Sequence, residues 1–555
     1  LDSPTNNFAT LNSAYNDQPG RTDASVYSEG NLSFTCTSSS FCVAYSTFSI
    51  PTSGKWYLEA YLDNGSICGV GIVTETGRES VTSGWGMGAV STSQGFATQA
   101  QYVNNSSSNN FALGTGTPSN GDIYQLAIDA DNNKVWIGLN NSWNDASGGT
   151  TGNPSSGTNH TIALTFGSDA QIGFQRTNSS PNTGMVANFG QDSSFAGNKT
   201  AQGNGGTDED FYYTPPTGYK ALNTRNLPDP AIALPTAYFN TVLYTGDGTT
   251  NHSITGVGFQ PDFVWYKVRS TTGHHNLYDS VRGVQKVVYS DLANAEATST
   301  GTQDLYAFGA DGFTVGSDFQ TLCNTNGSTF ASWNWKAGGA ASSNSDGTTT
   351  SSVSANTTAG FSIVSYAGSG SAGATVGHGL SQTPDLIIIK NRTAVTNWVV
   401  NSPITNSGFT EWALKLDLDQ ATSTDSTIWN NTAPTSSVFT LGTAGESNRN
   451  NPDNYVAYCF HSVDGYSKVG KYTGNGATDG PFIYTGFKPA FLMVKLVTAA
   501  SGSWVMFDNK RDPDNPTDRV FYADINAIST DVRSYSPYDS LSNGFTSRIP
   551  AAHDN

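Results

Sequence analysis

The chain has 555 residues, a formal net charge of −18 and only 13% charged residues, against about 25% in an average soluble protein. The absence of Lys- and Arg-rich stretches excludes an electrostatic nucleic-acid groove, and an anionic membrane surface would repel the chain. Apolar runs stay short of the ~20 residues of a membrane-spanning helix and no secretory signal opens the chain, so we expect no membrane insertion.

Residues 1–210 carry the signals of an antiparallel β-sandwich, and the 59 glycines and 12% aromatic residues fit an all-β protein. The alternating segment GKWYLEAY at 54–61 predicts one strand, and CGVGI at 68–72 predicts another. Residues 122–140 predict a hairpin around an Asp- and Asn-rich turn, and VANFG at 186–190 predicts the last strand.

These segments resemble the SPRY domain, a concanavalin-like β-sandwich, over about residues 25–200. The likeness rests on GKWYLE, CGVGI, the hairpin IDADNNKVWIGLNN and the terminal ANFG. It implies two packed antiparallel sheets whose end loops bind a ligand, either a peptide or a glycan.

Two tryptophans of this domain are candidate ligand-binding residues. Trp85 and Trp143 stand among small polar neighbours in long Gly-, Ser- and Asn-rich segments, an arrangement that can stack a sugar ring on an indole. The alternative is that each closes the end of the sandwich core, where large aromatic side chains more often lie.

The cysteines and acids of the domain raise the questions of a disulfide and a metal. Cys36 and Cys42 flank a short turn and could be joined by a disulfide, or could be two buried free thiols. The spacing of Asp129 and Asp131 could imitate a calcium loop, but a hairpin turn of this composition needs no metal. We expect no metal and no cofactor.

Residues 211–235 hold five of the 22 prolines and predict a stiff, extended connector that is docked by its tyrosines. Three related copies follow, at 236–358, 359–466 and 467–555, each with a Gly-rich turn, a Pro and an apolar run closed by Lys. Their length predicts a small β-sandwich-like domain with its own core for each copy, like beads on a string. The interpretation of the chain as an appendage depends on this repetition.

The apolar run of each copy, at 263–266, 386–389 and 491–494, indicates a central strand covered on both faces. The lysines that close the runs could contact a ligand, but we expect them to reach solvent or to pair with an acid such as Asp279 or Asp508. These lysines are Lys267, Lys390 and Lys495.

The third copy has no equivalent of the strands FASWNWK at 330–336 and YVAYCFH at 455–461 that finish the other two. A missing last strand leaves an open sheet edge. We expect that the natural protein continues past Asn555, or that a neighbouring chain supplies the strand. The start at Leu1 similarly looks internal or processed.

Catalysis finds no support in the sequence. A glycosidase on this fold needs two carboxylates facing one cleft, and Glu59 is the only acid within its strand. No Gly-x-Ser-x-Gly elbow is present, and the seven histidines are scattered. We therefore expect a protein that is not an enzyme.

The whole layout, with the connector YTPPTGYKALNTRNLPDPAIALP and the GFQPDFVW-type repeats, resembles structural proteins of tailed, notably marine, bacteriophages, usually taken to be tail fibres. The resemblance implies a homo-oligomeric protein on the virion surface, extracellular after release, with other virion proteins as partners. Three hypotheses follow: an adhesin for a bacterial surface glycan or protein, a head or tail decoration protein without receptor binding, and a capsule depolymerase.

Overall fold

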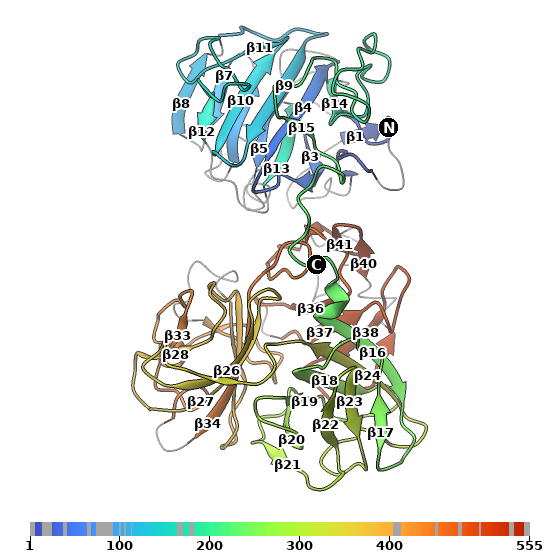
Figure 1. Cartoon of the computed structure of the whole chain (residues 1–555), viewed down its shortest axis with the longest axis vertical. Helices are drawn as coiled ribbons and strands as arrows, with labels where there is room; N and C mark the ends of the chain where they lie inside the picture. Colours follow the sequence, from blue (N-terminus) through green and yellow to red (C-terminus); the bar gives the residue numbers. More distant parts are fainter. Residues whose placement is uncertain are drawn as a thin grey trace. The chain divides into compact units, whose positions relative to one another are not determined.

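The computed structural model describes residues 6–13, 25–36, 42–63, 68–73, 93–98, 101–104, 107–112, 114–163, 170–176, 183–402, 412–449, 453–474, 480–498, 501–531 and 538–548. The chain divides into two compact units, Leu1–Asp229 and Pro230–Asn555 (Figure 1). Both units are built almost entirely of β-strands, which confirms the all-β prediction. None of the helices in the described ranges combines the length and the apolar character needed to cross a membrane.

The first unit is a sandwich of two antiparallel sheets, as predicted. The first sheet has the order β1-β2-β14-β4-β9-β10-β11, and the second has the order β3-β13-β5-β6-β7-β8. The strands of the first sheet are β1 (Ser25–Ser28), β2 (Ser33–Cys36), β14 (Thr183–Asn188), β4 (Lys55–Leu62), β9 (Ile123–Asp129), β10 (Lys134–Leu139) and β11 (Ser142–Trp143), with β12 (Ile162–Ala163) beside β10 and β15 (Lys220–Ala221) beside β4. Those of the second are β3 (Cys42–Ser49), β13 (Gln171–Arg176), β5 (Cys68–Val73), β6 (Ser93–Thr98), β7 (Gln101–Asn104) and β8 (Ser107–Ala112).

The predicted hairpin is formed by β9 and β10, with Asp129 opposite Lys134. Asp129 accepts a hydrogen bond from the backbone N–H of Asn132 at 3.1 Å and lies 3.3 Å from Nζ of Lys55. Asp131 accepts from the N–H of Gly54 at 2.9 Å. Both acids that could have imitated a calcium loop therefore stabilise the turn through protein contacts.

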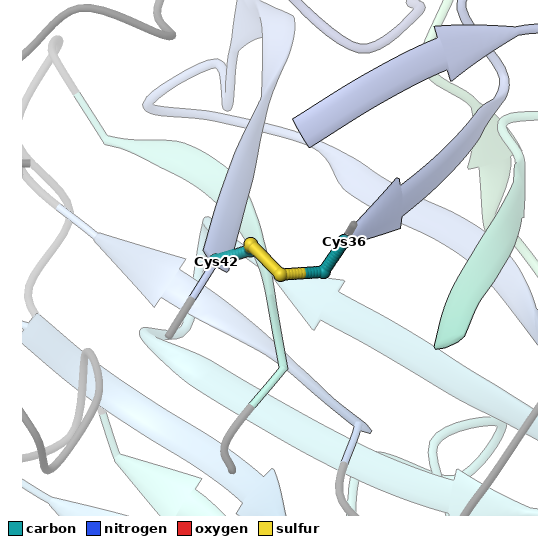
Figure 2. Close-up of a disulfide and its surroundings, with 2 residues drawn as sticks. All are labelled: Cys36 and Cys42. Atoms are coloured by element: carbon teal, nitrogen blue, oxygen red, sulfur yellow. A yellow bond between two sulfur atoms is a disulfide. The ribbon is translucent and has the colours of Figure 1, made fainter. Parts of the chain in front are cut away.

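A disulfide joins Cys36, at the end of β2, to Cys42, at the start of β3 (Figure 2). The two Cα atoms are 5.9 Å apart, which is within the usual span of such a bridge. Because β2 and β3 belong to different sheets, the bond links the two layers of the sandwich at one edge. Of the two alternatives left open by the sequence, the structure has the disulfide.

Most of the predicted connector belongs to the first unit, which extends to Asp229. Its strand β15 pairs parallel with β4, and Phe211 and Tyr219 are buried on the outer face of the first sheet. Docking by the tyrosines, which the sequence predicts, holds for Tyr219, which packs on the sheet. The docked segment is part of the first unit instead of a spacer between two domains. The boundary between the units falls at Asp229 and Pro230.

The second unit contains three lobes, and the described residues of each form a larger and a smaller sheet. Lobe 1 has the sheets β16-β24-β18-β19-β20-β21 and β17-β23-β22, made of β16 (Phe239–Thr245), β17 (His252–Ile254), β18 (Phe263–Val268), β19 (Asn276–Asp279), β20 (Lys286–Tyr289), β21 (Ala297–Thr298), β22 (Leu305–Gly309), β23 (Gly312–Val315) and β24 (Thr329–Trp335). A short 3-10 helix, η3 (Pro235–Ala237), precedes β16.

Lobe 2 has the sheets β25-β26-β27-β34-β29-β30 and β28-β33, with the pair β31-β32 beside them. Its elements are β25 (Ser342–Asn344), β26 (Ser351–Asn356), β27 (Phe361–Ala367), β28 (Ala374–Gly377), β29 (Leu386–Asn391), β30 (Val399–Asn401), β31 (Trp412–Ala413), β32 (Ser423–Thr424), α2 (Ser426–Trp429), β33 (Val438–Leu441) and β34 (Asn454–Phe460). Since β26 pairs with β27, lobe 2 begins before the predicted boundary at residue 359.

Lobe 3 has the sheets β36-β37-β38-β39 and β35-β41-β40. Its strands are β35 (Phe482–Tyr484), β36 (Phe491–Lys495), β37 (Trp504–Asp508), β38 (Arg519–Tyr522), β39 (Thr530–Asp531), β40 (Tyr538–Leu541) and β41 (Gly544–Ser547). Strands β18, β29 and β36 are equivalent: each follows the Pro of its copy and pairs antiparallel with the next strand, β19, β30 or β37.

The lobes share a core, and in this respect the prediction of three separately packed domains was wrong. Each lobe has a small apolar cluster of its own, but a further cluster joins Trp333 of lobe 1, Trp398 of lobe 2 and Phe521 of lobe 3. On β18, Val264 and Tyr266 face the lobe's own cluster and Trp265 faces the shared one. The three copies therefore form one body, not beads on a string.

The three recurring lysines lie at the junctions between lobes. Lys390 of lobe 2 donates to the carbonyl of Ala293 in lobe 1 at 2.8 Å, and Lys495 of lobe 3 donates to that of Asp419 in lobe 2 at 2.9 Å. Lys267 of lobe 1 lies over the ring of Phe521 in lobe 3, 5.1 Å from its centroid. Both expectations were wrong for Lys267 and Lys390, which are fully buried and do not reach solvent, and the expected pairing with Asp279 or Asp508 was wrong as well. Those acids instead hold the buried guanidinium groups of Arg282 and Arg511.

Candidate functional site

Strand β4 presents two different faces because successive side chains of a strand alternate. Trp56, Leu58 and Ala60 enter the core between the sheets. Tyr57 and Glu59 point to the outer face of the first sheet, where the segment after β14 covers them. The ring of Tyr57 packs edge-on against Phe211 with 4.8 Å between centroids.

Glu59 fixes this covering segment to the sheet. Its fully buried carboxylate accepts hydrogen bonds from the backbone N–H groups of Tyr212 and Tyr213, both at 2.8 Å. The hydroxyl of Tyr57 donates at 2.9 Å and the amide of Asn188 donates at 3.3 Å. Burial raises the pKa of Glu59 to about 7, although these four donors pull it down.

The hydrogen bonds of Glu59 hold Tyr212 and Tyr213 in a group of four aromatic side chains and one lysine. We call this group the Tyr61 patch: Tyr61, Phe195, Lys199, Tyr212 and Tyr213. Tyr61 stacks on the buried ring of Phe195 at 5.7 Å, and Tyr212 meets Tyr213 edge-to-face at 5.0 Å. The ammonium of Lys199 lies 5.7 Å from the ring centroid of Tyr61 and 5.9 Å from that of Tyr212. The three tyrosines and the lysine are half-buried, so part of each remains open to solvent.

The hydroxyl groups of the patch are available for a ligand. Within the described ranges, no protein hydrogen bond engages the hydroxyl of Tyr61, Tyr212 or Tyr213. Burial is the main cause that raises the pKa of Tyr61, and the charge of Asp63 is the second. Burial is also the main cause that raises the pKa of Tyr213, and the neighbouring Tyr212 is the second. Both phenols therefore stay neutral near pH 7 and can donate as well as accept.

The two predicted ligand-binding tryptophans are not brought together. Trp85 lies outside the described residues. Trp143 is half-buried at the end of β11, where its indole packs on Gly138 and lies 6.3 Å from the ring of Tyr57. Trp143 packs on the apolar cluster of the outer face of the first sheet, not at the end of the sandwich core, and its role in binding a ligand stays a prediction.

Sequence reasoning missed the Tyr61 patch because its residues come from separate stretches. Tyr61 ends the alternation of the GKWYLEAY strand, and Tyr212 and Tyr213 stand in the predicted connector. The available signal was the FYY run at 211–213, where one buried ring and two half-buried ones follow a polar loop.

This part of the first unit combines an enclosed acid with half-exposed aromatic groups. Glu59 is enclosed by four donors and does not face solvent. No group of three His, Cys, Asp or Glu side chains suited to a metal ion occurs in the described part of the chain. The Tyr61 patch offers flat rings, neutral hydroxyls and one cation.

Comparison with known proteins gives a family and a distant structural likeness. Residues 234–555 match the profile of a family described as "Domain of unknown function (DUF7483)". No curated protein matches the chain. Among solved structures, the chain is similar to the SPRY domain of human HERC1, with a TM-score of 0.23 and 11% identity over 29% of this chain and 91% of that one.

Proposed function

Because this chain belongs to the DUF7483 family, whose function is unknown, we propose a function from its own residues: a non-catalytic appendage of a bacteriophage particle that attaches to bacteria. The virion setting rests on the resemblance to tail-fibre-like proteins. The attachment role rests on the Tyr61 patch.

The patch has the properties of a glycan-binding surface. A tyrosine ring offers an apolar plane to the C–H face of a sugar, and its hydroxyl bonds to sugar hydroxyls. Because Glu59 already holds the backbone of Tyr212 and Tyr213, less conformational freedom is lost on binding. Weak single contacts would then combine through several copies of the protein on one particle.

The second unit supports the proposal as a rigid mount. Its three lobes share an apolar core, so they cannot move as independent domains. Because the lobes share a core, the second unit is not a repeated, independently folded surface. In the proposed function, the first unit carries the contact surface and the second unit is a rigid support.

A decoration protein of the head or tail is the second candidate, and the same shared core favours it. A single three-lobed body suits packing against other virion proteins as well as it suits carrying an adhesin. Locating the chain on intact particles separates the two candidates: a position confined to a capsid lattice contradicts attachment.

The direct test uses the dye-labelled full chain on a panel of bacterial surface polysaccharides. We expect binding to at least one member, and a loss of about ten-fold or more for Tyr212→Ala/Tyr213→Ala, by analogy with nucleobases stacked on aromatic side chains, which contribute on the order of 1–3 kcal/mol each. The matched control is Phe319→Ala, because Phe319 is an aromatic residue 59% exposed in the second unit. Equal binding by the double variant and the wild type contradicts the proposal. Release of reducing ends would instead identify a depolymerase.

A further inference from the structure

The three lobes of the second unit close into a circle through three equivalent junctions. In each junction, a backbone N–H of one lobe donates to a backbone carbonyl of another: Thr396 of lobe 2 to Ala293 of lobe 1 at 3.0 Å, Gly502 of lobe 3 to Asp419 of lobe 2 at 2.8 Å, and Gly273 of lobe 1 to Asn526 of lobe 3 at 3.1 Å. The last of these joins the first lobe to the third, so it closes the circle.

One position of each junction carries an aromatic side chain that reaches the neighbouring lobe. The indole N–H of Trp398 in lobe 2 donates to the carbonyl of Tyr289 in lobe 1 at 2.7 Å, and that of Trp504 in lobe 3 donates to the carbonyl of Lys415 in lobe 2 at 2.8 Å. Lobe 1 has His275 at this position. The equivalence is shown by the backbone N–H groups of the three residues, each of which donates to an acid of its own lobe, namely Asp291, Asp417 and Asp524. The junction that closes the circle therefore has a titratable side chain where the other two have an indole.

His275 is buried as a neutral imidazole because of the hydrogen bond that it accepts. Trp265 donates its indole N–H to Nδ1 of His275 at 3.0 Å. An indole N–H can only donate, so Nδ1 carries no proton. The imidazole also packs edge-on against Phe521 of lobe 3, with 5.8 Å between centroids. A proton on Nδ1 would therefore set two N–H groups against each other and bring a charge into an aromatic contact between lobes.

Cations approach His275 from both lobes of this junction. Burial and, next, the charge of Lys267 lower the pKa of His275 well below 6.5. Arg511 of lobe 3 and the adjacent His274 act in the same direction, whereas the backbone of Tyr522 in lobe 3 acts against them. A protonated His275 would thus be one more positive charge beside three others.

The acids of the same junction already have partners. Asp291 pairs with His274 at 2.6 Å and accepts the backbone N–H of His275, and Asp508 pairs with the buried guanidinium of Arg511. In the part of the chain that the structure describes, no carboxylate is bonded to the imidazole of His275. Protonation would therefore bring no ion pair that offsets its cost.

We propose that the junction between lobes 1 and 3 is acid-sensitive: protonation of His275 opens it, while the junctions at Trp398 and Trp504 stay closed. The closed form binds fewer protons at His275 than the open form does, so closure is favoured above pH 6.5 and weakens as the pH falls below it. Opening parts lobe 1 from Phe521 and uncovers part of the shared core, while lobe 2 still connects the two lobes.

The titrating groups of the other two junctions do not favour opening in mild acid. Burial raises the pKa of Asp417 to about 6, and burial also raises the pKa of Asp524. An acid whose pKa is raised in the folded state takes up its proton more readily there, so a falling pH does not weaken these junctions through either group. Lys390, with a pKa of about 8, keeps its charge between pH 7 and pH 5.

The test measures amide exchange of the full chain at Gly273, Thr396 and Gly502, the three donors across the junctions, at pH 7 and pH 5. Each rate is corrected for the intrinsic pH dependence of exchange. We expect the protection of Gly273 to fall at least ten-fold relative to the other two, because an imidazole with a pKa near 6.5 in the open form is about 30 times more often charged than neutral at pH 5. Equal changes at the three amides would overturn the proposal.

Two variants assign the effect to His275. Trp265 and Ile388 hold the same place, opposite the residue two positions after His275 or Trp398. Trp265→Ile/His275→Trp therefore gives lobe 1 the residue pair of lobe 2 and should abolish the acid response.

His274→Asn is the matched control, because lobe 2 has Asn397 at this position, and it should keep the response. A response that persists in the double variant, or that is lost in His274→Asn, would contradict the proposal. If the double variant does not fold, the comparison of the three amides in the wild type and in His274→Asn still decides.

Discussion

In the described residues, the two units differ in the cations that they bury: Lys267, Arg282, Lys390 and Arg511 are buried in the second unit, and no Lys or Arg is buried in the first. In the first unit, the buried carboxylate of Glu59 is enclosed by neutral donors and holds a covering segment on the sheet. In the second, cations are buried at the junctions of the lobes, either beside a carboxylate, as Arg511 is beside Asp508, or against carbonyl groups, as Lys390 is. The difference indicates that charge in the first unit organises a surface, whereas in the second it holds the lobes together.

The largest expected effect is on the pair in lobe 3. Asp508→Ala leaves the guanidinium of Arg511 buried without its carboxylate and removes the acceptor of the Trp333 indole N–H, which lies 3.1 Å away in lobe 1. We expect a loss of about 4 kcal/mol from the free energy of unfolding of the second unit. Denaturant titration with separate probes in the two units measures it.

The matched control for this change is Asp514→Ala, which removes an exposed acid of the same lobe. It should change stability by no more than about 0.5 kcal/mol. A loss below about 1 kcal/mol for Asp508→Ala would show that the junction relaxes around an unpaired guanidinium, against the role assigned to it.

The next effect is a pH dependence confined to the first unit. The folded state raises the pKa of Glu59 from 4.5 to about 7, so it binds more protons than the unfolded state between these values. This contribution is fully present below pH 4.5 and is lost as the pH rises through 7, on the order of 3 kcal/mol in all. Thermal melts between pH 4.5 and 8 should show it, and Glu59→Gln should flatten the profile.

The second unit should respond in the opposite direction and at higher pH. Burial lowers the pKa of both Lys267 and Lys390 to about 8. Because these folded-state values lie below the usual 10.5, the contribution is present above pH 10.5 and is lost as the pH falls through 8. We expect the second unit to gain on the order of 2 kcal/mol for each of the two lysines from pH 7.5 to about 9.5, before tyrosines titrate.

The variant Lys390→Met separates the contribution of Lys390 to the pH dependence from that of other titrating groups, because it lacks this ammonium group. The stability difference between wild type and variant should change with pH in that window. A constant difference would mean that the ammonium keeps its ordinary pKa at the lobe junction.

The sequence predicted the strands of the first unit well and the assembly of the second poorly. The alternation in GKWYLEAY and the Asp- and Asn-rich turn are local signals, and both gave the observed elements. The continuous apolar run at 263–266 already required cover on both faces. The second sheet of the same lobe covers only one face of such a strand, so the other face, which carries Trp265, needs cover from a neighbouring lobe. Local sequence patterns do not show which segment provides that cover.

The site was harder to predict than the fold for the same reason. The contact of Glu59 with the backbone of Tyr212 and Tyr213 joins residues more than 150 positions apart, and backbone N–H groups carry no sequence signature. The disulfide was foreseeable as an alternative because Cys36 and Cys42 are close in sequence, but the sequence alone could not decide it.

A smaller effect is expected from removing that disulfide. Cys36→Ser/Cys42→Ser frees the link between β2 and β3 and should cost the first unit about 2 kcal/mol, because the bond closes a short loop. The second unit should keep its stability. Differential scanning calorimetry with and without reductant checks both statements, and a loss in the second unit would contradict the division of the chain at Asp229.

The smallest effect is expected when an exposed ion pair of the first unit is removed. Arg225 and Asp208 form an ion pair in the first unit, but their side chains are 60% and 50% exposed, whereas those of Arg511 and Asp508 are fully buried. Water and salt screen an exposed pair, and ordering two long side chains costs entropy. Arg225→Ala should therefore change the free energy of unfolding by less than about 0.5 kcal/mol, and added salt should remove what is left. If this variant lost as much stability as Asp508→Ala, burial would not be what distinguishes the charges of the two units.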